Sequence, residues 1–438
     1  MSNIHPAAGA PSNSIFRVVA ASFIGTTIEW YDFFLYGTAA ALVFNRVFFP
    51  DLDRFAGTMA SFATYAVGFF ARPIGSIVFG HFGDRLGRKS MLITTLMLMG
   101  VATFLIGLLP TYDQVGIAAP ILLVILRFIQ GFGVGGEWGG AVLMVVEHAH
   151  EGRRGLYASW VQAGVPAGLL LANLVFMVFH AMPETAFMSW GWRLPFLFGA
   201  GLLGVGLFIR LEIMESPLFA KMRESKQQAS VPLLEVLRRY PRNVLLASGA
   251  RMAENGAFYV FTVFVLNYGT SARHLSESDM LNAILVGSMV QFIAIPGFGI
   301  LSDVIGRRPV YLGGAAGLAI FAYPFFQMVD TGNMLWVTVA IALALLTQSA
   351  MYAPQAAFFS ELFGTDVRYT GASIGYQLAA PLAGGLAPNI CLYLLHLAKG
   401  DSWGVAAYLI GLSTISLTSV WLAAETHRAR LADSDEKA

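Results

Sequence analysis

Charged residues are scarce in this sequence. They make up 12% of its 438 residues, whereas 56% are hydrophobic, and an ordinary soluble domain has about 25% charged residues. A soluble protein of this length needs charge to cover its surface, so most of this surface must face something other than water. The net charge of +1 also argues against nucleic acid as a partner.

Cysteine is nearly absent, and several chemical motifs are missing. The single Cys391 excludes an intrachain disulfide, and the eight histidines show no spacing typical of a metal site. There is no nucleotide-binding P-loop, so ATP is excluded as the energy source. No nucleophile clusters with a base, so we expect neither an enzyme nor a cofactor. Residues 1–14 lack the basic region and cleavage site of a signal peptide, so the first apolar run should remain in the protein.

Long apolar runs are what the sequence has instead. Several exceed the roughly 18 residues that cross a bilayer as a helix, and lipid leaves the backbone of such a run no partners outside the segment. We therefore predict an all-α membrane protein with twelve transmembrane helices. They are expected at residues 17–44, 57–80, 91–109, 119–147, 156–180, 192–212, 243–268, 280–302, 309–328, 334–361, 369–395 and 404–424.

A polar stretch at residues 213–242 separates two sets of six spans. We predict an N-terminal six-helix half at 1–212, a cytoplasmic linker at 213–242, a C-terminal six-helix half at 243–424 and a cytoplasmic tail at 425–438. With the N-terminus in the cytoplasm, 19 of the 27 lysines and arginines lie in cytoplasmic segments and four in periplasmic loops. This bias satisfies the positive-inside rule, so both termini are predicted to be cytoplasmic.

One loop sequence occurs twice. Residues 80–89 read G-H-F-G-D-R-L-G-R-K, and residues 299–308 read G-I-L-S-D-V-I-G-R-R. The two copies are 219 residues apart, which is half of the chain, and each follows the second span of its half. This spacing predicts a parallel duplication into two pseudo-symmetric halves, which can rock about a central site.

These loops resemble the signature of the major facilitator superfamily. The first copy fits it fully, and the second departs at Val304, where the first has Arg85. Other segments resemble the metabolite:proton symporter family within it, although Glu29 stands where that family has aspartate. Segments 40–50 and 375–379 are most similar to bacterial shikimate transporters. The family segments are residues 29–37 (E-W-Y-D-F-F-L-Y-G), 68–75 (G-F-F-A-R-P-I-G), 127–140 (R-F-I-Q-G-F-G-V-G-G-E-W-G-G), 190–196 (W-G-W-R-L-P-F) and 215–219 (E-S-P-L-F).

The resemblance implies a proton-coupled importer of a small carboxylate that works by alternating access. It further implies a monomeric, multi-pass protein of the bacterial inner membrane, with shikimate or a related hydroxylated ring acid as substrate. Other substrates of the family stay open: citrate, 2-oxoglutarate, a dicarboxylate, an aromatic acid, or proline and betaine. A drug exporter and a transport-dead nutrient sensor are the alternatives from other classes. A sensor should carry an added cytoplasmic domain, for which the 213–242 loop is too short.

A few ionisable residues fall inside the spans, where each costs roughly 2.5–3.5 kcal/mol on insertion scales. The helical rise places Glu29, Asp32 and Arg127 close to the midplane. We predict that Arg127 receives the substrate anion, because its planar fork suits a carboxylate. Asp32 or Glu29 would carry the proton, since hydrocarbon favours a protonated carboxyl and a nearby cation favours the carboxylate. The structural alternative is an ion pair of Arg127 with Asp32 or Glu137.

Two further arginines lie within spans. Arg251 and Glu254 are spaced i, i+3 and share a helix face, so they are either a second proton or substrate element or a static pair. Arg72 precedes Pro73 near the cytoplasmic end of the second span. We expect Arg72 to snorkel or to brace the signature loop rather than to bind substrate.

Neutral polar residues in the spans are expected to shape the pocket of a polyol substrate. Gln130 and Tyr376 are the strongest candidates, because they fall on faces otherwise made of small residues. The alternative for each residue is an interhelical hydrogen bond, worth about 0.6 kcal/mol on average. The substrate-contacting candidates are Arg127, Gln130, Tyr36, Gln162, Asn255, Tyr259, Tyr376 and Gln377.

The signature loops are predicted to close the cytoplasmic face. Asp84 can accept hydrogen bonds from the amides at a neighbouring helix N-terminus, where the helix dipole favours an anion. Arg85 and Arg88 can pair with carboxylates at nearby helix ends, and such pairs must break before the site opens inward. The alternative is a tight basic turn that fixes topology. The gating candidates are Asp84, Arg85, Arg88, Asp303, Arg307, Glu137, Glu361 and Arg368.

Glycines are concentrated in the fourth span. Residues 131–140 contain small-x-x-x-small spacings, which allow two helices to approach closely. No strand precedes this segment, so it is not a dinucleotide-binding fingerprint. We therefore predict a tight helix–helix contact there.

Overall fold

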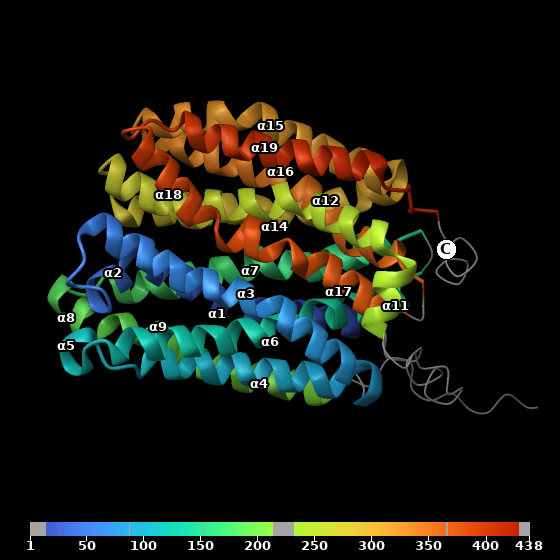
Figure 1. The fold of residues 1–438 in the computed structure, drawn as a ribbon, viewed down its shortest axis with the longest axis horizontal. Helices are drawn as coiled ribbons and strands as arrows, with labels where there is room; N and C mark the ends of the chain where they lie inside the picture. Colours follow the sequence, from blue (N-terminus) through green and yellow to red (C-terminus); the bar gives the residue numbers. More distant parts are fainter. Residues whose placement is uncertain (1–14, 87, 151, 213–231, 365–366, 429–438) are drawn as a thin grey trace, which may run out of the picture.

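The computed structural model of the chain describes residues 15–86, 88–150, 152–212, 232–364 and 367–428. At residues 83–86, 88, 210, 212 and 232 it describes the backbone alone. Within this part of the chain the structure is helical and contains no strand (Figure 1). The predicted fold class is therefore confirmed.

Twelve long helical segments follow one another along the described chain, and each coincides with a predicted span, although α3 extends beyond its predicted end at residue 80 to Leu86. They are α1 (Ile15–Leu42), α3 (Arg54–Leu86), α4 (Arg88–Gly107), α6 (Ala118–His148), α7 (Arg154–His180), α9 (Leu194–Glu212), α12 with η2, α13 and η3 (Pro241–Tyr259, Val260–Phe264, Val265–Asn267 and Tyr268–Ala272), α14 (Glu277–Ile305), α15 (Arg307–Asp330), α16 (Met334–Glu361), α17 with η4 and α18 (Arg368–Leu378, Ala380–Gly385 and Ala387–Leu397), and α19 (Trp403–Leu422). Short helices connect them: α2 (Phe44–Val47), α5 (Tyr112–Val115), α8 (Glu184–Ser189), η1 (Gly191–Arg193) and α11 (Pro232–Arg239).

Ten of these segments are long and apolar enough to cross a membrane, counted within the described residues. The other two are α1 and the α12–η3 segment, which carry the paired candidates Glu29 and Asp32, and Arg251 and Glu254. From Ile28 onward α1 is buried on every side, as expected of a helix inside a bundle rather than at its surface. Each of these two segments therefore places two ionisable side chains in the interior of the bundle.

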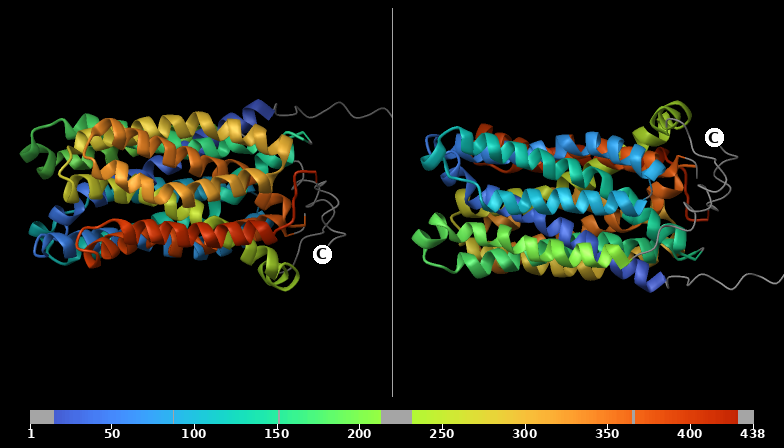
Figure 2. Two further views of the ribbon diagram at one scale, coloured as in Figure 1. Left: turned by 90° about the horizontal axis from the view of Figure 1, so that it is seen from above. Right: turned by 90° about the horizontal axis from the view of Figure 1, so that it is seen from below.

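The helices form two bundles that lie side by side. In Figure 1 the blue-to-green helices α1 to α9 occupy mainly the lower part and the yellow-to-red helices α12 to α19 mainly the upper part, except that the orange α17 lies level with α3. Figure 2 shows the long axes running in a common direction. Across the junction α7 packs on α14, and α3 packs on α17 and η4. The exact division at residues 213–242 stays a prediction, and residues 213–231 are outside the described chain.

The two ends of the bundle differ. We call the end with residues 80–89 and 299–308 the signature-loop end, and the end with α2, α5 and α8 the opposite end (right and left in Figure 1). At the signature-loop side the Tyr369 hydroxyl donates to the Gly136 carbonyl (2.7 Å). At the opposite end Arg54 donates to Ser271 (3.1 Å) and the Asn389 amide to the Met59 carbonyl (3.0 Å). The halves therefore contact each other at both ends, which is a closed arrangement.

Helices α3 and α6 approach each other at the level of their backbones. A Cβ placed on Gly131 would collide with the carbonyl of Gly68, and one on Gly135 with the carbonyl of Arg72. A Cβ on Gly75 would meet the carbonyl of Phe132 in the same way. The close approach predicted for the fourth span is confirmed, and it places the side chains of α3 and α6 in one cluster.

Candidate functional site

Arg127 projects from α6 and is fully buried among aromatic rings. Its Cζ lies 4.1 Å from the ring centre of Phe33, 4.2 Å from that of Tyr36 and 4.6 Å from that of Tyr65. Such ring faces attract a cation that has lost its water. Nη1 donates to Oε1 of Gln130, whereas Nη2 has no hydrogen-bond partner among the described residues. One edge of the guanidinium is therefore able to bind an acceptor.

Gln130 connects Arg127 to the region of Asp32. Its amide nitrogen donates to the Thr103 hydroxyl (2.8 Å) and to the backbone carbonyl of Asp32 (3.4 Å). The Asp32 carboxyl is buried beside Gly199, where a Cβ would lie 3.1 Å from Oδ1, and that oxygen has no hydrogen bond from a described residue. Arg127 makes no ion pair with Asp32, so the first static pair considered above is not formed.

The position of the Arg72 side chain differs from the prediction made from sequence. Its side chain is fully buried, and its Cζ lies 4.2 Å from the ring centre of Phe33, 4.3 Å from Phe69 and 5.3 Å from Trp30. The expectation that Arg72 snorkels is therefore wrong. The close packing of α3 on α6 directs this side chain into the interior, next to Arg127.

The remaining polar candidates are buried but differ in whether their polar atoms are hydrogen-bonded. The Tyr36 hydroxyl donates to Thr64 (2.7 Å), so it is engaged within its own half. In contrast, the Tyr259 hydroxyl, the Asn255 amide nitrogen and the Gln377 carbonyl oxygen lack hydrogen-bond partners among the described residues. Tyr259 packs edge-on against Phe69, with ring centres 4.9 Å apart. Through Tyr259 and Asn255 the C-terminal half thus presents unsatisfied polar atoms to the aromatic cluster of the N-terminal half.

Glu254 lies within a chain of glutamine side chains in the C-terminal half. Gln348 donates to its Oε1 (2.8 Å) and Gln355 to its Oε2 (3.4 Å). Gln348 itself accepts from Gln291 (2.5 Å), and Gln355 also donates to the Tyr311 hydroxyl (3.0 Å). Several donors therefore surround this carboxyl group, and they join α12, α14, α15 and α16.

Arg251 and Tyr376 form a stack at the junction of the two halves. The Arg251 Cζ lies 3.0 Å from the centre of the Tyr376 ring, and Trp138 stacks on Tyr376 with ring centres 3.6 Å apart. Trp138 donates to Gln162 (2.9 Å), and Gln162 donates to the Tyr352 carbonyl (3.1 Å). Tyr376 and Gln162, both substrate candidates, thus bridge the halves in this closed structure.

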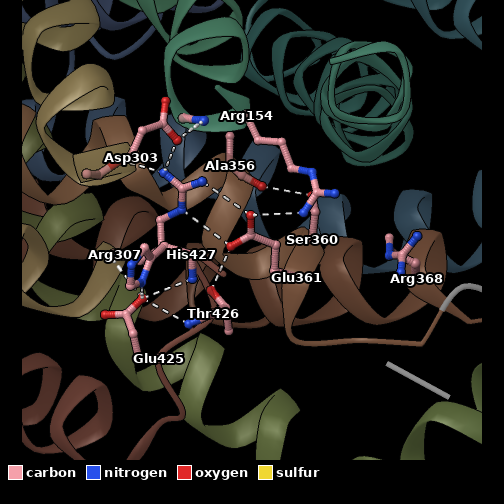
Figure 3. A network of polar contacts seen from close by, with 12 residues as sticks. Arg154, Asp303, Arg307, Ala356, Ser360, Glu361, Arg368, Glu425, Thr426 and His427 are labelled. Atoms are coloured by element: carbon pink, nitrogen blue, oxygen red, sulfur yellow. Dashed lines mark hydrogen bonds and ion pairs between the residues drawn. The ribbon is translucent and has the colours of Figure 1, made fainter. Parts of the chain in front are cut away.

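A network of charges closes the signature-loop end (Figure 3). Arg307 pairs with Asp303 (2.7 Å) and with Glu361 (3.2 Å), and Arg154 lies 3.9 Å from the same glutamate. Asp303 also accepts hydrogen bonds from the backbone N–H groups of Gly155 (2.8 Å) and Leu156 (2.9 Å) at the N-terminus of α7. The anion–helix contact predicted for Asp84 is therefore observed at its repeat partner Asp303. The residues of α7 belong to one half and those of α14 to α16 to the other.

The segment after α19 joins this network. Glu425 accepts hydrogen bonds from the backbone N–H of Arg307 (2.9 Å) and of Arg308 (3.0 Å), and the Thr426 hydroxyl donates to Glu361 (2.7 Å). Gly306 permits this approach, because a Cβ there would lie 2.7 Å from the Glu425 carboxylate. Glu425 therefore caps the N-terminus of α15.

Other predicted gate residues are placed less directly. The side chains of Asp84, Arg85 and Arg88 lie outside the described part of the chain. Arg368 is buried, donates to the Phe363 carbonyl (3.2 Å) and lies to one side of the Glu361 network in Figure 3. Glu137, and the proton candidate Glu29, are buried in α6 and α1.

Several contributors were missed from sequence. Tyr65, Trp138 and the three glutamines at 291, 348 and 355 carry no charge, so they were not distinguished from structural residues. The signal for two of them was available, because Gln348 and Gln355 are seven residues apart and share a helix face. Arg154 lies between the spans predicted at 119–147 and 156–180, and its side chain faces Glu361. Within the described residues no cluster of His, Cys, Asp and Glu could hold a metal ion.

Comparison with known proteins agrees with this architecture. Residues 22–388 match the Major Facilitator Superfamily. A shikimate transporter of Escherichia coli (strain K12) is 42% identical over 417 residues, covering 94% of this chain and 95% of that protein. The inner membrane metabolite transport protein YhjE of that strain is 40% identical over 430 residues, covering 96% and 97%. The proton:xylose symporter XylE bound to 6-bromo-6-deoxy-D-glucose has the same fold, with a TM-score of 0.76, 16% identity and coverage of 96% and 98%. The resemblance inferred from sequence is confirmed.

Proposed function

Because this chain belongs to the Major Facilitator Superfamily, we propose that it is a proton-coupled importer of a small carboxylate, with shikimate or a related hydroxylated ring acid as substrate. The shikimate transporter that is 42% identical to it supports this choice. The single observation that carries the proposal is the buried Arg127, which has an unsatisfied Nη2 beside hydroxyl-bearing rings. A planar cation next to hydroxyl groups suits a hydroxylated carboxylate.

Protons are the proposed energy source. Taking one anion into a negative interior costs about 2.3 kcal/mol per 100 mV, and one proton cancels that charge. Asp32 is the proposed carrier, because Gln130 joins its backbone to Arg127. A substrate carboxylate bound to Arg127 would compete with Gln130 for the guanidinium. Because Gln130 also donates to the Asp32 carbonyl, anion binding would then change the surroundings of Asp32. Glu254, surrounded by amide donors, is the second candidate.

The proposed placement is the bacterial inner membrane, with the signature-loop end and both termini in the cytoplasm. The excess of lysine and arginine in the segments at that end supports the orientation. The Arg307, Glu361 and Arg154 network would then be the inner gate, and it must break before substrate leaves. In the same proposal the protein acts as a monomer.

Uptake into proteoliposomes with an imposed pH gradient tests the proposal. Labelled shikimate should accumulate when the interior is alkaline, and a protonophore should abolish that accumulation. The same vesicles offered citrate, 2-oxoglutarate, benzoate, proline and betaine would identify another substrate of the family. Accumulation of none of these compounds by correctly folded protein would refute the importer.

A further inference from the structure

Arg72 is an unexplained buried cation in this structure. It is 0% exposed, and Nε, Nη1 and Nη2 all lack a hydrogen-bond partner among the described residues. The Tyr259 hydroxyl is close enough to interact with it, but without hydrogen-bond geometry. A guanidinium has five N–H donors, and a buried donor without an acceptor is costly. Aromatic contacts offset part of that cost but satisfy no N–H group in its plane.

Arg72 shares its surroundings with Arg127. The centre of the Phe33 ring lies 4.2 Å from Cζ of Arg72 and 4.1 Å from Cζ of Arg127. The two cations therefore cannot be farther apart than these two distances combined. Like charges so close repel each other when water is excluded, and no carboxylate of a described residue forms an ion pair with either. The pair is consequently arranged for an anion that the protein itself does not provide.

Polar atoms without partners surround the two cations. The Tyr65 and Tyr259 hydroxyls and the Asn255 amide nitrogen are buried without hydrogen bonds from described residues. The rings of Tyr65 and Tyr259 are 5.9 Å apart, and that of Phe69 contacts both Tyr259 and Arg72. Donors for an anion and partners for hydroxyl groups thus lie together at the junction of α1, α3, α6 and α12.

We infer that Arg72 is a second receptor for the substrate carboxylate, which Arg72 and Arg127 bind together. This inference rests on the proposed function and extends it to a residue for which the sequence predicted no contact with substrate. Binding requires the Phe33 and Tyr65 side chains to turn aside, so that the carboxylate replaces ring faces as the partner of the two guanidiniums. Tyr65, Tyr259 and Asn255 then bind the hydroxyl groups of the ring, which orients the acid.

The test compares an acid with its neutral amide. Dissociation constants for shikimate and for its primary amide are measured by calorimetry on detergent-purified wild type, Arg72→Gln and Arg193→Gln. The last variant is a matched control, because Arg193 also stacks on an aromatic ring (Trp192, 4.3 Å) but lies at the opposite end. A general packing defect would weaken the acid and the amide equally, whereas loss of a carboxylate contact weakens the acid alone.

The expected result is a preference for acid over amide that falls about tenfold in Arg72→Gln, with the amide affinity little changed and Arg193→Gln like wild type. An unchanged preference in Arg72→Gln overturns the inference while leaving the proposed function intact. Wild-type protein that binds neither shikimate nor any other acid refutes both. If Arg72→Gln does not fold, Arg72→Lys is measured instead, since lysine keeps the charge but lacks the planar guanidinium that binds a carboxylate through two N–H groups. A preference for acid over amide that is reduced at least about threefold supports the inference. An unchanged preference overturns it.

Discussion

At the scale of single residues, position in the bundle decides what an arginine does. Arg46 and Arg127 carry the same guanidinium, yet the first pairs with Glu184 at an exposed site and the second is enclosed by aromatic rings. An exposed ion pair contributes little to stability, whereas a cation in hydrocarbon is retained only for pairing or function. The residue-scale predictions therefore concern the interior charges.

Arg127→Lys should bind shikimate at least about tenfold more weakly than wild type, because lysine keeps the charge but lacks the planar fork that grips a carboxylate. The measurement is the dissociation constant in detergent, with the melting temperature as a control for folding. Normal affinity and normal uptake in this variant would remove Arg127 from the receptor role.

Asp32→Asn should lose accumulation driven by a pH gradient while retaining exchange of labelled for unlabelled substrate. The amide cannot carry a proton, but it still permits the loaded protein to change conformation. Both activities are measured in the same proteoliposomes, with Glu254→Gln as the matched variant. If Asp32→Asn accumulates substrate normally and Glu254→Gln does not, the proton carrier is Glu254.

Charge and depth made part of this site predictable. Arg127 and Asp32 were selected from sequence because ionisable residues near the midplane are expensive. The snorkelling predicted for Arg72 is wrong because its distance along α3 placed it near one end of the span. The glycine contacts that direct its side chain inward depend on the packing of α6 against α3, which the sequence does not show. The unsatisfied hydroxyls of Tyr65 and Tyr259 could not be found in the same way, since sequence does not show which partners a tyrosine lacks.

At the scale of elements, the N-terminus of α15 depends on a residue more than a hundred positions away. Gly306 has a positive φ of 109° and no side chain to cap the helix. Glu425 supplies the cap from beyond α19. Burial alone would raise the pKa of Glu425, but hydrogen bonds from the backbone N–H groups of Arg307, Arg308, His427 and Thr426 outweigh it and lower that pKa below its ordinary value of 4.5.

Glu425→Ala should lower the stability by about 1 kcal/mol at pH 7, the usual cost of losing a helix cap. Because the pKa of Glu425 is lower in the folded than in the unfolded protein, its stabilisation is present above pH 4.5 and is lost as the pH falls through the folded-state value. Melting temperatures of variant and wild type should therefore differ at pH 7 and converge on acidification below pH 4.5.

Glu184→Ala is the control for that comparison. Glu184 belongs to an exposed pair with Arg46 at the opposite end, so its loss should change the melting temperature very little at any pH. A difference between Glu425→Ala and wild type that does not depend on pH would show that the cap does not act through its charge.

The bounds of the elements were the most predictable part of the fold. Apolar runs end where lipid ends, so the span predicted at 334–361 coincides with α16 (Met334–Glu361). The π-helical segments η2, η3 and η4 were not predicted. These segments pack closely against neighbouring helices; Gly384 of η4, for example, packs against Phe69 and Tyr259. Such packing between helices is not a local property of the sequence.

At the scale of the whole molecule, the two halves touch at both ends, and the proposed mechanism of alternating access requires the contacts at each end to break in turn. The duplicated loops predicted two halves, but they could not predict the closed arrangement. Contacts such as Arg54 with Ser271, or Tyr369 with Gly136, depend on how two preformed surfaces meet. Such surfaces are built from residues far apart in the sequence.

Joining the halves at the opposite end should stop transport. The variant Arg54→Cys/Ser271→Cys, in a Cys391→Ser background, is treated with a cleavable bifunctional thiol reagent. Uptake of shikimate should fall to the level of empty vesicles and return on reduction, because this end can no longer open. Single-cysteine variants treated identically should transport normally. Undiminished uptake by the joined protein would mean that these surfaces need not separate.

The backbone contact between α3 and α6 has a final consequence. Two helices with no side chains between them at Gly68, Gly75 and Gly131 have little freedom to slide. When α3 and α6 reorient in the proposed mechanism, the backbones that carry Arg72 and Arg127 should therefore move together, and the spacing between these two residues should be preserved. A bound acid would stay at the central site between two guanidiniums of fixed separation, and its release would depend on water reaching them rather than on the two guanidiniums moving apart.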